Sequence, residues 1–464
     1  MRLWIALFVY AASVAAAVQL VVLPELLPTW HAGDGLVVGG DWVYFHRLAV
    51  SLAQQIRASG WSAWQLRPEG QAPAGIAAAV YALTVPQPWT IIPVSAALFA
   101  TACLTLLQIV RALAPGWRVA ALCSLPFALY PSAMLLYAQI HKDVYAGAGV
   151  LLFLCGLVSM VRAVPWQAGA TRLLGPILCL LGGMVLVWVV RPYEVLMMQG
   201  VVVALAPVIV ALHLWRGLRG ILSWRRAVLA VLVTCVVPLA MGPFTQEPLP
   251  ARGSAVPSPP PVATPTRVPT VESPPSVAEE ALALVARAVA PVERKAETLA
   301  VLRNQFLDAY GDSAALIDGN VRLRAGQDVV GYVPRAAEIA LLAPFPDQWL
   351  AAGSLQPNTL MRRVSALEMI GVYLSLPFAL YALIRWRRRI EIWVIWGFCL
   401  GMMLVYAVAT PNVGSLYRVR YPFLMTLVAV GLAALSAFLA GLNGRRLPSS
   451  EAASNAVDAT EDRA

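Results

Sequence analysis

Charged residues are scarce in this chain. Of its 464 residues only 12% are charged, whereas about 25% is usual for a soluble globular protein. Hydrophobic residues make up 59% of the chain. A chain this long and this apolar exceeds what a soluble core buries, because only a lipid bilayer tolerates so much hydrocarbon outside a core. The composition therefore predicts an all-α polytopic membrane protein.

Lysine, histidine and cysteine are also sparse. The only lysines are Lys142 and Lys295, so the net charge of +10 comes from arginines, which gather in short loops between apolar runs. That pattern is typical of cytoplasmic loops and not of a nucleic-acid-binding surface. The four histidines form no His-Glu-x-x-His pair, and the six cysteines lie in apolar runs without Cys-x-x-Cys spacing. We expect the cysteines to pack in the core, and we expect no dedicated zinc site.

Ten apolar runs are long enough to cross a bilayer. They fall near residues 3–24, 89–110, 118–136, 143–161, 173–190, 193–213, 227–244, 367–384, 391–409 and 421–441. The arginines of alternate loops then share one side, from Arg2 to Arg445 and Arg446, which places both termini in the cytoplasm. The first run also has the basic start and small-residue end of a secretory signal peptide, but it continues through Leu27, so we expect a retained signal anchor.

Two long segments, 25–88 and 245–366, then lie outside. Within the first, 74–86 is too short to span and predicts a re-entrant or interfacial helix. We divide the chain into a transmembrane module at 1–244, a Pro-rich linker at 245–276, an outer helical segment at 277–366, transmembrane helices at 367–441 and a disordered cytoplasmic tail at 442–464.

The outer segment 277–366 has two helical patterns. Apolar residues three and four apart predict a helix over 277–310 with a break near Pro291. The stretch "RAAEIALLAPFPDQWLAAGS" predicts a helix on the outer membrane surface, with "FPDQW" at 345–349 as an aromatic anchor.

Polar residues at the outer ends of these helices are the candidates for chemistry, because charge near a bilayer is costly. They form four sets: Asp41 with Tyr44, His46 and Arg47; His141, Lys142 and Asp143; Arg191, Tyr193 and Glu194; and Arg418 with Arg420. A carboxylate can take a proton from an acceptor hydroxyl or amine, and arginines can hold a phosphate as it leaves. The alternative is that these charges only anchor helix ends at the headgroups. Asp34, in a glycine-rich loop, rivals Asp41, although a turn role suits it better.

The order of several motifs resembles the GT-C integral-membrane glycosyltransferases that use polyprenyl-phosphate sugars, the broad group of protein mannosyltransferases, aminoarabinose transferases and Rgt-like bacterial enzymes. "GGDWVYFHRLAVSLAQQI" follows the first span, and "YPSAMLLYAQIHKDVYAG" leads to an acid at the start of the fourth. Arg191-Pro192 and the late "RVRYP" complete the likeness, which covers most of 1–210 and 367–441. The usual acid pair is here Asp41-Trp42, and 245–366 has no counterpart.

The resemblance implies sugar transfer from a polyprenyl-(di)phosphate carrier to a lipid, glycan or protein on the outer face of a bacterial inner membrane. It implies Asp41 as general base, Asp143 as a supporting or metal-proximal acid, and Arg191, Arg418 and Arg420 as phosphate holders. Substrate contacts are expected from Tyr44, His46, Arg47, His141, Lys142 and Tyr193. No cofactor is certain, since some members need a divalent cation and others do not.

Three other interpretations stay open. An O-antigen ligase or polymerase-like protein also acts on lipid-linked glycans, but it usually relies on a histidine in a late outer loop, and 245–366 has none. A transporter or flippase for lipid-linked sugars would place its charges near the bilayer midplane and show repeat symmetry. A non-catalytic envelope scaffold would use the Pro-rich tract to bind a partner.

Overall fold

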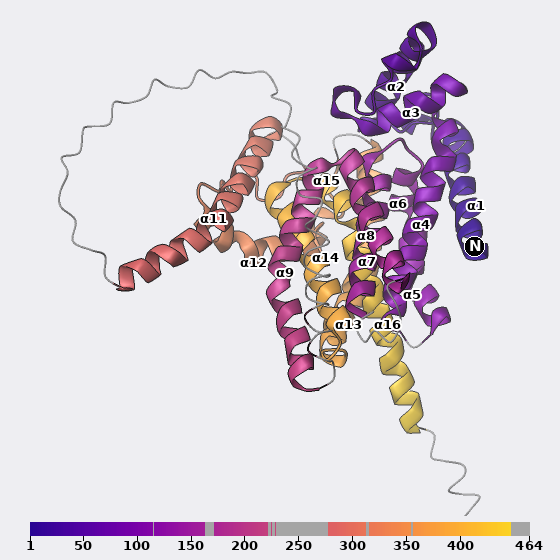
Figure 1. Cartoon of the computed structure of the whole chain (residues 1–464). Helices are drawn as coiled ribbons and strands as arrows, with labels where there is room; N and C mark the ends of the chain where they lie inside the picture. Colours follow the sequence, from indigo (N-terminus) through magenta and orange to yellow (C-terminus); the bar gives the residue numbers. More distant parts are fainter. Residues whose placement is uncertain are drawn as a thin grey trace, which may run out of the picture.

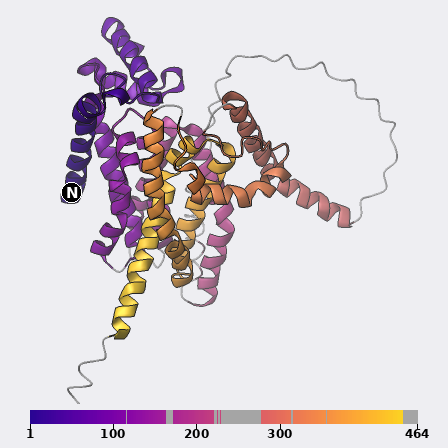
Figure 2. The same ribbon diagram turned by 180° about the vertical axis from the view of Figure 1, so that it is seen from behind.

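The computed structural model describes residues 1–114, 116–162, 171–220, 277–311, 315–353 and 356–446, with Trp224 and Val228. Over these residues the chain is a bundle of helices, and apart from two isolated β-bridges it holds no β-structure (Figures 1 and 2). The all-α polytopic fold expected from composition is confirmed.

Eight of the described helices are long and apolar enough to cross a bilayer. They are α1 (Arg2–Ala17) with its π-helical continuation η1 (Val18–Leu26), α4 (Ile92–Arg111), α7 (Lys142–Arg162), α8 (Thr171–Val190), α9 (Pro192–Leu218), α13 (Gln356–Arg385), α14 (Ile390–Ala409) and α16 (Tyr421–Arg446). Each corresponds to an expected span, although α13 begins about three turns earlier than expected and α9 ends later. The span expected at 227–244, the Pro-rich tract and the tail from 447 lie outside the described residues.

The span expected at 118–136 is not one straight helix. It consists of α5 (Trp117–Leu129) and α6 (Pro131–Tyr137), bent by 66° at Tyr130. Pro131 explains the break, because proline lacks the N–H that would continue the helix and drives the preceding residue into extended backbone. The Glu368 carboxylate of α13 fixes the bend, since it accepts hydrogen bonds from the N–H of Ser132 at 2.8 Å and from its hydroxyl at 2.5 Å.

Two helices between α1 and α4 stack on each other at one end of the bundle, at the top of Figure 1. Phe45, Leu52 and Ile56 of α2 (Asp41–Ser59) pack against buried alanines of α3 (Ala72–Leu83). At 12 residues α3 is too short to span, as expected from the sequence. Around these two helices lie four single-turn 3₁₀ segments, η2 (Pro28–Trp30), η3 (Trp61–Ala63), η4 (Pro68–Gly70) and η5 (Pro88–Ile91).

The described part of the segment between α9 and α13 holds α11 (Val277–Tyr310), α12 (Gly326–Leu342) and the short η8 (Pro346–Gln348). The break expected near Pro291 is wrong, because α11 is helical throughout. The helix expected from Arg335 onward begins earlier, at Gly326, and ends before Pro344. Its buried face packs on α14, so α12 belongs to the main core. In "FPDQW", Trp349 packs against Tyr373 at 5.8 Å between ring centroids.

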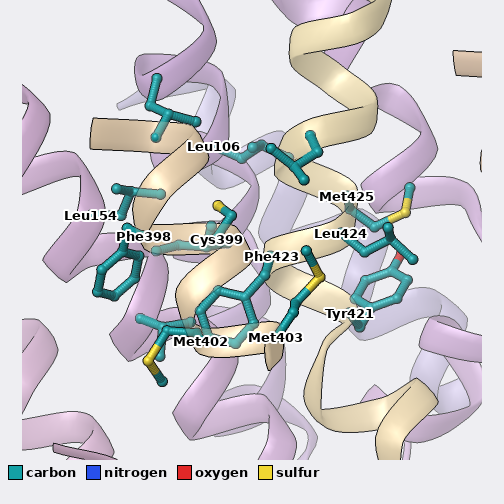
Figure 3. Packing of buried hydrophobic residues seen from close by; sticks show 14 of the residues in the cluster. Leu106, Leu154, Phe398, Cys399, Met402, Met403, Tyr421, Phe423, Leu424 and Met425 are labelled. Atoms are coloured by element: carbon teal, nitrogen blue, oxygen red, sulfur yellow. The ribbon is translucent and has the colours of Figure 1, made fainter. Parts of the chain in front are cut away.

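The core sits where α14 and α16 meet α4 and α7. Figure 3 shows Phe398, Met402 and Met403 of α14 near Phe423 of α16, and the Phe398 and Phe423 ring centroids lie 6.1 Å apart. Beside them α7 and α8 approach closely, because a Cβ at Gly183 would lie 2.5 Å from the carbonyl oxygen of Gly149. Small residues permit such close packing of membrane helices. This frame fixes the first residues of α7 and the last residues of α8, where the candidate residues lie.

Candidate functional site at one end of the bundle

Residues from four separate segments converge at one end of the bundle. Asp41 opens α2, His141 precedes α7, Arg191 joins α8 to α9, and Arg418 lies on α15 (Val413–Val419). Ion pairs and hydrogen bonds connect them through His141 and Asp143. We call Asp41, His141, Lys142, Asp143, Arg191 and Arg418 the polar cluster.

His141 is the centre of the polar cluster. Its Nδ1 lies 2.9 Å from Oδ2 of Asp143, and its Nε2 lies 3.0 Å from Nη1 of Arg418 and 3.9 Å from Oδ2 of Asp41. Because a guanidinium only donates, Nε2 must accept from Arg418. A neutral ring then carries its proton on Nδ1, which can donate to Oδ2 of Asp143. In this tautomer Nδ1 does not accept the Asp143 backbone N–H, whose nitrogen lies 3.2 Å away. Asp143 thereby sets the tautomer that Arg418 needs.

Arg191 is a buried cation held by acids. Its Nη2 donates to Oδ1 of Asp143, and its Nη1 lies 3.5 Å from Oε2 of Glu194. Burial alone would lower the pKa of Arg191, but the carboxylates of Asp143 and Glu194 outweigh it and raise that pKa above its usual range. Arg67, in the segment between α2 and α3, donates to the carbonyl oxygens of Trp188 at 2.7 Å and Val189 at 3.0 Å, which ties that segment to the end of α8.

Asp41 is the exposed acid of the polar cluster. Its side chain is 65% exposed, whereas that of Asp143 is 10% exposed. The backbone before it is tightly held, because Trp42 Nε1 donates to the carbonyl oxygen of Val37 at 2.5 Å, and a Cβ at Gly40 would lie 2.1 Å from the Trp42 ring. The Gln139 side chain also accepts from the N–H of Val37 at 3.2 Å. The Asp41 carboxylate is thus accessible, and the backbone that carries it is held in place.

Two half-buried cations lie beside Asp41. Arg418 and Asp41 approach the same nitrogen of His141. Lys142 interacts electrostatically with Asp41 and places its Nζ 5.7 Å from the centroid of the Phe45 ring. In the described part of the chain the Lys142 ammonium makes no ion pair within 4 Å. Tyr193 is half exposed at the start of α9. This arrangement suits an anionic group that approaches an acid.

Three expected substrate contacts on α2 lie apart from the polar cluster. His46 Nδ1 lies 2.9 Å from the Tyr81 hydroxyl, and its Nε2 lies 3.5 Å from Oδ2 of Asp34. Burial lowers the pKa of His46, although Asp34 partly opposes this. Tyr44 donates to Glu69, and Arg47 is exposed. The structure therefore does not bring Tyr44, His46 or Arg47 into the polar cluster, and it gives Asp34 a partner away from it.

Arg420 also departs from its expected role. Its side chain is fully buried and donates to the carbonyl oxygens of Ile339 at 2.9 Å, Ala340 at 2.6 Å and Ala343. Ile339 and Ala340 lie in the last turn of α12, and Ala343 directly follows it. Carbonyls at a helix end lack part of the hydrogen bonding found inside the helix, although that of Ile339 also accepts from the N–H of Ala343 at 3.1 Å. Burial lowers the pKa of Arg420 to about 10. Arg420 fastens α12 to the start of α16, and its expected role as a phosphate holder stays a prediction that these contacts do not support.

Two residues that position the polar cluster were not identified from the sequence. Gln139 supports the loop before Asp41, and Glu368 accepts a hydrogen bond from the Tyr417 hydroxyl at 2.5 Å, next to Arg418. A lone carboxylate inside an apolar run was a usable signal for Glu368, because such groups are rare in membrane helices. Gln139 gave no comparable signal, since its partner Val37 is 102 residues away.

The described residues do not form a ligand set for a divalent cation. No three His, Cys, Asp or Glu side chains there converge as ligands. Of the two acids nearest His141, Asp41 is exposed. Asp143 is not free to bind a metal ion, because its two oxygens already face His141 and Arg191. The donor set at this end of the bundle therefore does not fit a resident metal.

Comparison with protein-family models gives no match, and comparison with curated proteins gives none. The structure is similar to that of the archaeal oligosaccharyltransferase AglB from Archaeoglobus fulgidus, which was solved in complex with an inhibitory peptide and a dolichol-phosphate. The two sequences are 12% identical, and the TM-score is 0.48. The match covers 96% of this chain and 51% of AglB, so this chain spans about half the length of that protein.

Proposed function

We propose that this chain is a membrane glycosyltransferase that moves a sugar from a polyprenyl-phosphate or polyprenyl-diphosphate carrier to a lipid, glycan or protein acceptor on the non-cytoplasmic face. One observation carries the proposal. An exposed carboxylate, Asp41, lies beside two half-buried cations, Lys142 and Arg418, at one end of a membrane bundle. This is where an interfacial phosphate-linked sugar would meet an acceptor.

In the proposed reaction Asp41 is the general base. An acceptor hydroxyl or amine forms a bond to the anomeric carbon of the sugar and gives its proton to the Asp41 carboxylate. The bond from that carbon to the carrier phosphate oxygen breaks, and its electron pair leaves with the phosphate. Asp41 suits this step better than Asp143, because its carboxylate is exposed and Asp143 is engaged by His141 and Arg191.

Lys142 and Arg418 are the proposed phosphate holders. Charge that builds on the leaving phosphate is stabilised by cations fixed in place before the reaction. Arg191 is less suited to this role than the sequence indicated, because Asp143 and Glu194 already take up its donors. We assign His141, Asp143 and Arg191 to positioning, since together they orient Arg418. No step is assigned to a metal ion.

The test is sugar transfer in proteoliposomes that contain the purified protein, a lipid-linked sugar donor and an envelope acceptor extract. Parallel reactions with monophosphate and diphosphate carriers would identify the donor class. We expect labelled sugar to move from donor to acceptor in a reaction that depends on Asp41. Movement of the donor between leaflets without transfer would contradict the proposal and favour the transporter interpretation.

A further inference from the structure

A group of arginines lines a cavity at the opposite end of the bundle from the polar cluster. There a cavity of about 840 Å³ opens between the α13–α14 turn, the α4–α5 turn and α16. Its polar and aromatic lining comes from Tyr381, Arg385, Trp386, Arg387, Arg388 and Arg389. Figure 1 shows α13, α14 and α16 together at this end, away from α2 and α3.

Three of these arginines are available to a ligand. In the described part of the chain, the guanidinium groups of Arg385, Arg387 and Arg388 make no ion pair or hydrogen bond, and all three residues are exposed. Arg389 differs, because its Nη1 donates to the carbonyl oxygens of Ala112 and Leu113, at 3.2 Å each. Arg389 thus closes one wall of the cavity, while the other three cations face it without partners.

The rest of the lining is apolar and continues onto the outer surface of the bundle. Ala437 and Ala440 of α16 and Ile384 of α13 line the cavity, and Ile384 is 66% exposed. Tyr381 packs edge-on against Phe438 at 5.8 Å between centroids. A ligand that fills this space would meet cations at its head and hydrocarbon along its body.

We propose that this cavity binds an anionic phospholipid, with the phosphate between Arg385, Arg387 and Arg388 and the acyl chains along α13 and α16. Arginine at helix ends is common in membrane proteins, because the positive-inside rule alone favours it. What distinguishes this place is the cavity itself, the unpaired guanidiniums facing it and the aromatic and aliphatic walls. Basic pockets between transmembrane helices are known to take up such headgroups.

The experiment measures retention of phosphatidylglycerol and phosphatidylcholine by the full-length protein in native mass spectrometry. The test variant is Arg387→Gln/Arg388→Gln, which leaves Arg389 and the cavity wall intact. The matched control is Arg216→Gln/Arg219→Gln at the end of α9, where Arg219 lies 5.2 Å from the Trp215 ring but lines no part of this cavity. A second variant, Arg387→Lys/Arg388→Lys, keeps the charge at both positions, so it shows whether a loss of binding comes from the lost charge or from misfolding.

We expect the wild type, the control and the lysine variant to prefer phosphatidylglycerol. The glutamine variant should lose about 30-fold in apparent affinity for it, from the usual worth of two arginines near an anionic headgroup. The proposal would be overturned if the control variant lost as much affinity for phosphatidylglycerol as the glutamine variant, or if the wild type retained both lipids equally. Full displacement of the lipid by 10 mM inorganic phosphate would also overturn it. Phosphatidylglycerol retention that appears only after removal of residues 447–464 would assign the cavity to the acidic tail instead and would also overturn it.

Discussion

Arg418 and His141 are 277 residues apart in sequence, yet Nη1 of Arg418 lies 3.0 Å from Nε2 of His141. The other ring nitrogen of His141 faces Asp143, and Asp143 in turn accepts from Arg191. The contact therefore links α15 to the starts of α7 and α9. The Asp143–Arg191 pair within this network is tested by the third prediction.

Asp41→Asn should leave the protein folded and lower transfer by about 10² to 10⁴, the usual worth of a general base. The amide keeps the size of the carboxylate but cannot take a proton. Asp34→Asn is the matched control, because Asp34 has a φ of 54° that asparagine also tolerates. The assay is transfer in proteoliposomes per amount of folded protein. Full activity in Asp41→Asn with loss in Asp34→Asn would move the base to the glycine-rich loop.

Arg418→Ala and Arg420→Ala should differ in kind. Loss of Arg418 should raise the donor KM roughly 10- to 100-fold with little effect on thermal stability, since a hydrogen bond to a charged group is worth that much. Loss of Arg420 should lower the free energy of unfolding by about 3 kcal/mol, because it strands buried carbonyls of α12. Its folded fraction should keep the wild-type KM. A donor KM raised by Arg420→Ala alone would return Arg420 to the site.

Asp143→Asn should destabilise the protein by about 3 to 5 kcal/mol, because it leaves the buried Arg191 with one weaker partner. The double variant Asp143→Asn/Arg191→Met should lose less than the sum of the single changes. Unfolding by SDS titration measures both. Asp308→Asn, which breaks an exposed ion pair with Arg322, is the control and should change stability by less than about 1 kcal/mol. Additive losses would mean that Asp143 and Arg191 are not coupled.

Asp318 predicts a pH dependence of stability. Hydrogen bonds from Arg335 at 3.0 Å, together with one from Tyr332, hold the pKa of Asp318 below its usual 3.8. A carboxyl with a lowered pKa in the folded state stabilises the protein above pH 3.8 and loses that contribution as the pH falls through the folded pKa. The melting temperature of Asp318→Asn should therefore lie below wild type at pH 7, and the gap should shrink below pH 4. A gap independent of pH would contradict this.

The arginine pattern predicts the orientation of the bundle. Reporter fusions after residues 60 and 300 should report the non-cytoplasmic side, and fusions after 167, 220 and 388 should report the cytoplasm. The polar cluster would then lie outside and the arginine-lined cavity inside. A cytoplasmic signal at residue 300 would invert both assignments.

Much of the fold was predictable from sequence. Long apolar runs such as 143–161 gave the corresponding helices within a few residues, because a bilayer demands about 20 apolar residues per span. The bend at Tyr130 was not predicted, although Pro131 signals it, because a proline inside an apolar run is compatible with either a kink or a break. The opposite error was made for α11, where a break was predicted near Pro291 but the helix is continuous.

The polar cluster was predictable in part. Asp41, His141, Asp143, Arg191 and Arg418 were each visible as charges at helix ends, and the structure brings them together. His46 was grouped with them because it follows Asp41 closely in sequence, but its position about one turn into α2 directs it toward Tyr81 of α3. Helix ends indicate depth in the membrane, whereas the direction of a side chain depends on what packs around it.

Sequence by itself determined which segments are helical, how many of the described ones are long enough to span, and which of their ends carry charge, because these follow from local hydrophobicity and length. Only the tertiary structure decided which charges meet. Arg418 and Arg420 look equivalent in "YRVRYP", yet successive residues on a helix are rotated by about 100°, so these two point to nearly opposite sides. One reaches His141, and the other is buried against the carbonyls of α12.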